Sequence, residues 1–167
     1  TAESIQQALQ AHDLKLVLFN VVADDLLQGG EGLAAVPEKQ DRFKVAVAQA
    51  LAYAKVLKPD CINVLSGRCL NAGRLAEYEK TFRRNLRYAA DVFAEIGVTT
   101  VFEAINSRDM PGFIVDGSAK MLSIWHGLNH PQLRLQYDIY HMSRMGEVCA
   151  AFLSLHIDKI AHIQFAD

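Results

Sequence analysis

Hydrophobic positions along the chain alternate between short runs rich in β-branched residues and long stretches with helical spacing. The short runs cover residues 15–21, 61–67, 99–106, 133–140 and 160–166. Strand, helix and strand repeated in this way are typical of parallel βαβ units. The pattern therefore predicts an α/β fold with at least five parallel strands.

Two of the intervening stretches are clear helices. Phe82, Leu86, Ala89, Phe93 and Ile96 are spaced by 4, 3, 4 and 3 residues, which places them on one helical face, and Gly97 is a good residue to end that helix. The Ala-rich stretch Gln40–Leu57 predicts a second helix, which must end before Pro59 because proline cannot continue it.

Polar side chains recur on one face of the predicted strands. Successive strand residues point to opposite sides, so Leu135 and Tyr137 share one face while Gln136 and Asp138 share the other. The same alternation separates further polar residues from their apolar neighbours: Asn63, Glu103, His162 and Gln164. A doubly wound sheet is apolar on both faces, whereas a closed barrel with helices outside can be polar inside. The sequence therefore favours a barrel with its chemistry at the C-terminal strand ends.

A Glu, an Asp and a Gln from three successive strands would then converge on one point. Taken singly, an acidic residue near a strand end more often caps a helix or pairs with a lysine, and His162 is more often a satisfied core histidine. The coincidence on one face favours a divalent-metal site.

The charge, the cysteine spacing and the absence of long apolar runs argue against several classes of function. The net charge of −2 and the pI near 6.3 give no reason to expect nucleic acid or an anionic membrane as partner. Cys61, Cys69 and Cys149 have no zinc-site spacing, and an odd count fits a reducing cytoplasm. No apolar run approaches the roughly 20 residues that span a bilayer. We expect a cytoplasmic enzyme.

Three segments resemble motifs of the hydroxypyruvate isomerase family, within the xylose-isomerase-like barrels. Phe-Glu-Ala-Ile-Asn-Ser-Arg-Asp-Met-Pro-Gly-Phe at 102–113 resembles the fifth-strand motif, Gln-Tyr-Asp-Ile-Tyr-His-Met at 136–142 the sixth, and His-Ile-Gln-Phe-Ala-Asp at 162–167 the seventh. The resemblance covers nearly the whole chain. It implies a TIM (β/α)8 barrel, present here as a partial barrel of about strands three to seven.

The resemblance implies a divalent metal, Mg²⁺ or Mn²⁺, bound by Glu103, Asp138 and Gln164. A further glutamate on strand eight has no counterpart here, and the first two strands are also absent. The chain has no initiator Met, so we interpret residues 1–167 as one domain of a fragment or an incompletely traced protein. Open strand edges would favour association, and a homo-oligomer is among the expected states.

The implied reaction is that of an intramolecular oxidoreductase, which interconverts hydroxypyruvate and tartronate semialdehyde through a metal-stabilised enediolate. Glu103 would be both metal ligand and acid/base. Four residues are expected to bind the substrate: Asn63, Arg108, Asp109 and His141. For His141 a loop histidine bonded to backbone remains an alternative, and for Arg108 and Asp109 a surface salt bridge.

Rival functions stay open at this point. A 2-oxo-tetronate isomerase or a ketose 3-epimerase would share these site residues, and a loop would set substrate length. The loop after the first predicted strand, Asn-Val-Val-Ala-Asp-Asp-Leu at 20–26, lacks the Pro and Trp usual in the family. An abasic-site nuclease would need several metals, many His ligands and a basic groove. A non-catalytic fragment that only binds partners is a further alternative.

Overall fold

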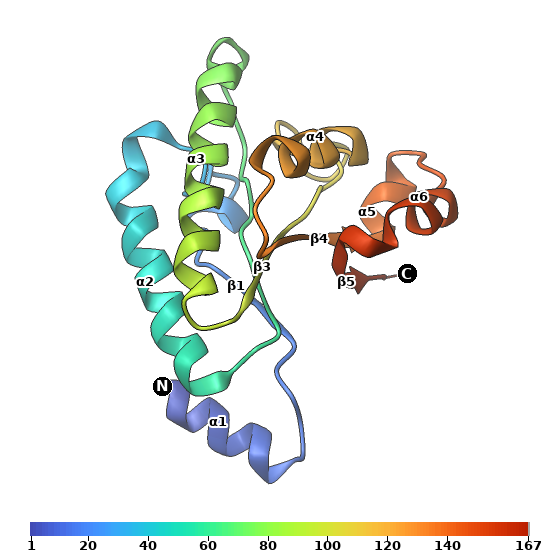
Figure 1. Cartoon of the computed structure of the whole chain (residues 1–167). Coiled ribbons are helices and arrows are strands. Elements are labelled where there is room, and N and C mark those ends of the chain that lie inside the picture. Colours follow the sequence, from blue (N-terminus) through green and yellow to red (C-terminus); the bar gives the residue numbers. More distant parts are fainter. Residues whose placement is uncertain (167) are drawn as a thin grey trace.

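Five parallel strands form one sheet in which the order along the chain is also the order in space. The computed structural model describes residues 1–166. Its strands are β1 Leu18–Asn20, β2 Cys61–Asn63, β3 Thr99–Phe102, β4 Leu133–Asp138 and β5 Ile160–Gln164. Each pairs in parallel with the next. This sequential parallel order confirms the predicted α/β partial barrel (Figure 1).

Helices connect the strands. They are α1 Ala2–Ala11, α2 Gln40–Leu57, α3 Leu75–Ala94, α4 Ser118–Leu128, α5 Ile139–Arg144 and α6 Cys149–His156. In Figure 1, α2 and α3 run side by side along the sheet. No helix in the described part of the chain is long and apolar enough to cross a membrane.

The apolar stripe of α3 forms the centre of the core. Phe82, Leu86, Ala89 and Phe93 are fully buried, and the ring of Phe82 meets that of Phe102 edge-on with centroids 6.1 Å apart. The helix ends at Ala94, and Gly97 adopts a φ of +72° that suits glycine. Ile96 therefore lies beyond the helix, in the turn, which corrects the expectation that the helix runs to Gly97.

The strands have the predicted positions but are shorter than predicted. The run 133–140 was expected to be extended throughout, yet Ile139 and Tyr140 already begin α5. Asp138 explains the early end, since its side chain accepts a hydrogen bond from the backbone of His141 at 3.2 Å and so caps the helix. The runs 15–21, 61–67, 99–106 and 160–166 likewise contain strands of only three to five residues, flanked by loops.

The two faces of the sheet differ as the alternation predicted. Apolar strand residues pack in the core with the helices: Ile62, Phe102, Leu133, Leu135 and Tyr137. The opposite face carries the polar residues described next.

Candidate active site at the strand ends

A cavity of about 260 Å³ lies where the C-terminal ends of the strands meet. Its lining is polar at the strand ends and apolar at the side: Leu18, Asn20, Leu65, Glu103, Ile105, Gln136, Asp138, His141 and Gln164. Parallel strands bring their carboxyl ends to one edge, so residues distant in sequence converge there. The structure thus brings together four residues predicted from the sequence, namely Glu103, Asp138, His141 and Gln164.

Glu103, immediately after β3, is a buried carboxyl group. Only 6% of the residue is exposed, and its Oε1 accepts a hydrogen bond of 2.7 Å from Nδ2 of Asn63. Burial, with a further contribution from the nearby Asp138 carboxylate, raises the pKa of Glu103 to about 7. A carboxyl group that titrates near neutrality can both accept and return a proton.

Asn63, at the end of β2, holds Glu103 in place. It is fully buried, and its Nδ2 also lies 3.1 Å from Oδ1 of Asn20, which lines the cavity. Asn63 was expected to bind substrate. In the structure its side chain contacts two other residues of the site, Asn20 and Glu103.

Asp138 and His141 complete an acidic cluster with Glu103. One ligand atom from each of the three lies within 4.8 Å of the others. Two carboxylates so close together repel each other, and a cation between them would relieve that repulsion. Oxygen donors of this kind suit Mg²⁺ or Mn²⁺. The two carboxylates of this cluster therefore fit a divalent cation.

Amide groups from β4 and β5 add further oxygen atoms. Nε2 of Gln136 donates to Oε1 of Gln164 across the paired strands. Within the described residues, Oε1 of Gln136 is buried without a hydrogen-bond partner. A buried unpaired acceptor is costly, and Gln136 is one of the residues that line the cavity.

Arg108 and Asp109 lie at the rim rather than in the cavity lining. Arg108 borders a neighbouring hollow together with Tyr140 and Arg144. Both oxygens of Asp109 are engaged, because Asn106 and the Tyr140 hydroxyl donate to one and Arg144 donates to the other. These donors lower the pKa of Asp109 to about 2. Asp109 is therefore an ionised anchor for its own loop and α5.

Sequence reasoning did not single out Asn20 or Asn106. Asn106 is fully buried and touches both Asp109 and His141. An asparagine at the end of the predicted run 99–106 was the available signal, but its contacts depend on the fold of the loop.

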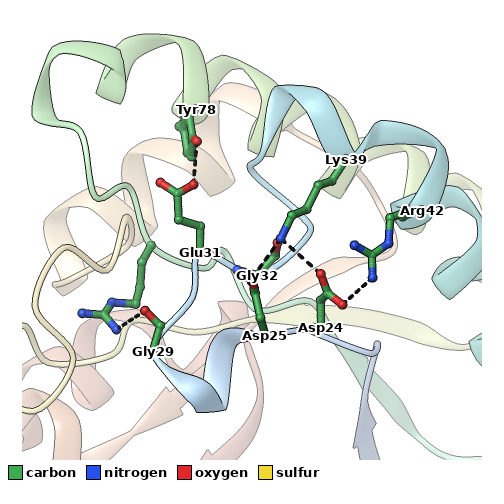
Figure 2. Close-up of polar contacts among 9 residues, drawn as sticks. Asp24, Asp25, Gly29, Glu31, Gly32, Lys39, Arg42 and Tyr78 are labelled. Carbon is green, nitrogen blue, oxygen red and sulfur yellow. Dashed lines mark hydrogen bonds and ion pairs between the residues drawn. The ribbon is translucent and has the colours of Figure 1, made fainter.

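The loop of residues 21–36, here called the β1 loop, is fixed by ionic contacts (Figure 2). Lys39, just outside the loop, places Nζ 3.1 Å from both Asp24 and Asp25 and 3.2 Å from the carbonyl of Gly32. Arg42 also pairs with Asp24. Farther along the loop, the Tyr78 hydroxyl of α3 donates to Glu31 at 2.9 Å. These contacts lie within the same loop that lacks the Pro and Trp usual in the hydroxypyruvate isomerase family.

We expect the metal-free protein to lose stability as pH rises, because of Glu103. Its folded-state pKa of about 7 lies above the ordinary 4.5, so the folded state retains a proton that the unfolded chain loses. The contribution of protonated Glu103 to the free energy of unfolding is complete below about pH 4.5. It is lost as pH rises through about 7, which lowers the free energy of unfolding by on the order of 3 kcal/mol. Urea unfolding in EDTA at several pH values should show this loss in the wild type and a flatter profile in Glu103→Gln. Parallel profiles for the two proteins would contradict it.

Comparison with known proteins places these observations in a family context. The model of the family described as "Xylose isomerase-like TIM barrel" matches residues 1–167. Hydroxypyruvate isomerase of Escherichia coli K12 is 33% identical over 165 residues, which cover 99% of this chain and 64% of that protein. The 2-oxo-tetronate isomerase of Cupriavidus necator is 34% identical over 165 residues, with the same coverage of 99% and 64%.

A solved structure gives a similar result. A crystal structure described as an AP endonuclease, family 2, from Brucella melitensis matches with a TM-score of 0.93 at 31% identity, over 99% of this chain and 64% of that one. This chain therefore spans less than two thirds of the length of each of these relatives.

Proposed function

We propose that the protein is an isomerase that interconverts hydroxypyruvate and tartronate semialdehyde. The premise is that this chain belongs to the xylose isomerase-like TIM barrel family. The observation that carries the proposal is Glu103, a buried carboxyl group with a pKa of about 7 that faces a small polar cavity at the strand ends. The two compounds differ in the placement of hydrogen on neighbouring carbons, so the reaction needs a group that takes a proton from one carbon and returns it to the next. A carboxyl group can perform both steps, and Glu103 is the buried one that lines the cavity.

Each neighbour of Glu103 has a role in this scheme. Asn63 orients the carboxyl group through its hydrogen bond of 2.7 Å. His141 faces the same cavity and would contact a substrate oxygen. Leu65 and Ile105 form an apolar side that limits water near the reacting carbons.

Glu103, Asp138 and Gln164 would hold a divalent cation, Mg²⁺ or Mn²⁺. When bound, such a cation acts as a Lewis acid that polarises the substrate carbonyl and favours the developing negative charge. The close approach of the two carboxylates and the place of Gln164 in the cavity lining support this donor set. We further propose that the protein acts in the cytoplasm on a small hydroxy or keto acid.

A 2-oxo-tetronate isomerase is the second candidate, favoured by the identity of 34% to the Cupriavidus necator protein. The two functions differ by one carbon in the substrate. Because both substrates present the same keto acid group to the site, the comparison of kcat/KM must be quantitative.

Turnover assays on the full protein separate these functions. We expect Mg²⁺- or Mn²⁺-dependent conversion of hydroxypyruvate with a higher kcat/KM than for a four-carbon 2-oxo acid or a ketohexose. A preference for the four-carbon acid would assign the second function, and a preference for a ketohexose would indicate a 3-epimerase. Cleavage of an oligonucleotide with an abasic site, without isomerase activity, would overturn the proposal.

A further inference from the structure

Asn106 connects the loop after β3 to His141 on α5. Its Oδ1 accepts a hydrogen bond of 2.8 Å from the backbone N–H of Asp109. Its Nδ2 lies 2.9 Å from Oδ2 of Asp109 and 2.8 Å from Nδ1 of His141. Three contacts, one through Oδ1 and two through Nδ2, are therefore defined around one buried side chain.

The orientation of the Asn106 amide is forced by these partners. A backbone N–H can only donate, so the atom facing it must be the amide oxygen. The Asp109 carboxylate, ionised and held by Tyr140 and Arg144, can only accept, so the atom facing it must be the amide nitrogen. Rotating the amide by half a turn would break both contacts. The NH₂ group then has one hydrogen for Asp109 and one for His141.

We propose that Asn106 is a positioning residue that keeps the His141 proton on Nε2, so that His141 donates a hydrogen bond to a substrate oxygen and does not ligate the metal. Nδ1 must be the acceptor because it faces an N–H group, and a neutral imidazole then carries its proton on the other nitrogen. The donor role toward the substrate and the statement about the metal rest on the proposed function, whereas the tautomer of His141 does not.

The position of Nε2 agrees with this role. It lies 4.0 Å from Oδ2 of Asp138, too far for a hydrogen bond, and His141 lines the cavity. A metal ligand would need a free electron pair on Nε2, which this tautomer lacks. The His141 ring therefore belongs to the substrate side of the cluster, and the metal ligands come from the acidic and amide residues beside it.

The tautomer can be measured without substrate. In the full protein labelled with ¹⁵N-histidine, NMR separates protonated from unprotonated ring nitrogens at about pH 8, above the ordinary histidine pKa of about 6.5. The chain has six histidines, so the signals of His141 are assigned by their loss in His141→Gln. We expect a protonated Nε2 and an unprotonated Nδ1, unchanged when Mg²⁺ is added. A proton on Nδ1, or loss of the Nε2 proton on adding Mg²⁺, would overturn the proposal.

An exchange of two side chains tests the part played by Asn106. In Asn106→Asp combined with Asp109→Asn, only acceptor oxygens would face Nδ1, and the proton should move to Nδ1. Asp109→Asn alone leaves the Asn106 amide held by the backbone and should keep the wild-type tautomer. If the double variant folds, as judged by its NMR spectrum, and retains the Nε2 proton, Asn106 does not set the tautomer. The wild-type spectrum decides the tautomer itself even if the double variant does not fold.

Activity gives a separate readout. Loss of one hydrogen-bond donor to the substrate should lower kcat/KM of the double variant by roughly 10- to 100-fold relative to Asp109→Asn. If no tested substrate turns over in the wild type, the proposed function fails while the NMR result still stands. A shifted tautomer with unchanged kcat/KM would overturn the donor role.

Discussion

Replacing Glu103 by Gln should lower the turnover of hydroxypyruvate by roughly 10²- to 10⁴-fold, the range that general acid–base groups contribute. Glutamine keeps the shape of the side chain and can still meet Nδ2 of Asn63 through its amide oxygen. It cannot accept a proton from carbon. Steady-state kinetics at saturating Mg²⁺ measure the effect, and we expect the loss in kcat.

The matched control is Asp158→Asn, which removes an exposed carboxylate whose partner is the adjacent Lys159. It should leave kcat within about twofold, as expected of a surface substitution. Circular dichroism and thermal melting of Glu103→Gln should show a folded protein. If that folded variant keeps wild-type kcat, Glu103 is not the proton-transfer group.

Asp138→Asn should weaken the binding of Mg²⁺ or Mn²⁺ by more than roughly 100-fold. Altering a residue that only hydrogen-bonds to a metal ligand already costs roughly 10- to 100-fold in affinity, and Asp138 is proposed as a direct ligand. The substitution removes a charge from the pair of carboxylates at the cavity. Asparagine also caps helices well, so the hydrogen bond to the backbone of His141 and the start of α5 should survive. Isothermal titration of the full protein with Mn²⁺ measures the affinity, and EDTA should abolish turnover of the wild type.

Asp138→Ala separates the two roles of this residue. It should lose metal affinity like Asp138→Asn and in addition lose about 1 kcal/mol of stability with the helix cap. Metal affinity equal in the wild type and Asp138→Asn would exclude Asp138 as a ligand. Full turnover of the wild type in excess EDTA would remove the metal from the proposed reaction.

The fold was predictable because alternation and helical spacing are local properties of the sequence. Leu135 and Tyr137 had to face one side and Gln136 and Asp138 the other, whatever the length of the strand. Strand ends were less predictable. Ile139 and Tyr140 are good strand residues, but the cap formed by Asp138 begins a helix there, and a cap competes with strand extension in a way that propensity does not reveal.

The convergence of Glu103, Asp138 and Gln164 followed from parallel strands, which bring their carboxyl ends to one edge. The roles of Arg108, Asp109 and Asn106 depend on the conformation of the loop after β3, which no periodicity describes. For Asp109 the sequence left both substrate binding and a surface salt bridge open, and the structure shows a salt bridge with Arg144 and a hydrogen bond from Tyr140, both on α5. These contacts require α5 to pack beside the loop.

The position of Lys39 has a consequence for protein engineering. Lys39 stands outside the β1 loop, yet it bonds Asp24, Asp25 and the carbonyl of Gly32 within it. Its side chain is only 23% exposed, so a transplanted loop without those acceptors would leave an ammonium group poorly solvated. The β1 loop and Lys39 should therefore be exchanged together when chimaeric proteins are made. Chimaeras meant to alter substrate choice should place their crossover after Arg42, so that both cationic partners of Asp24 travel with the loop.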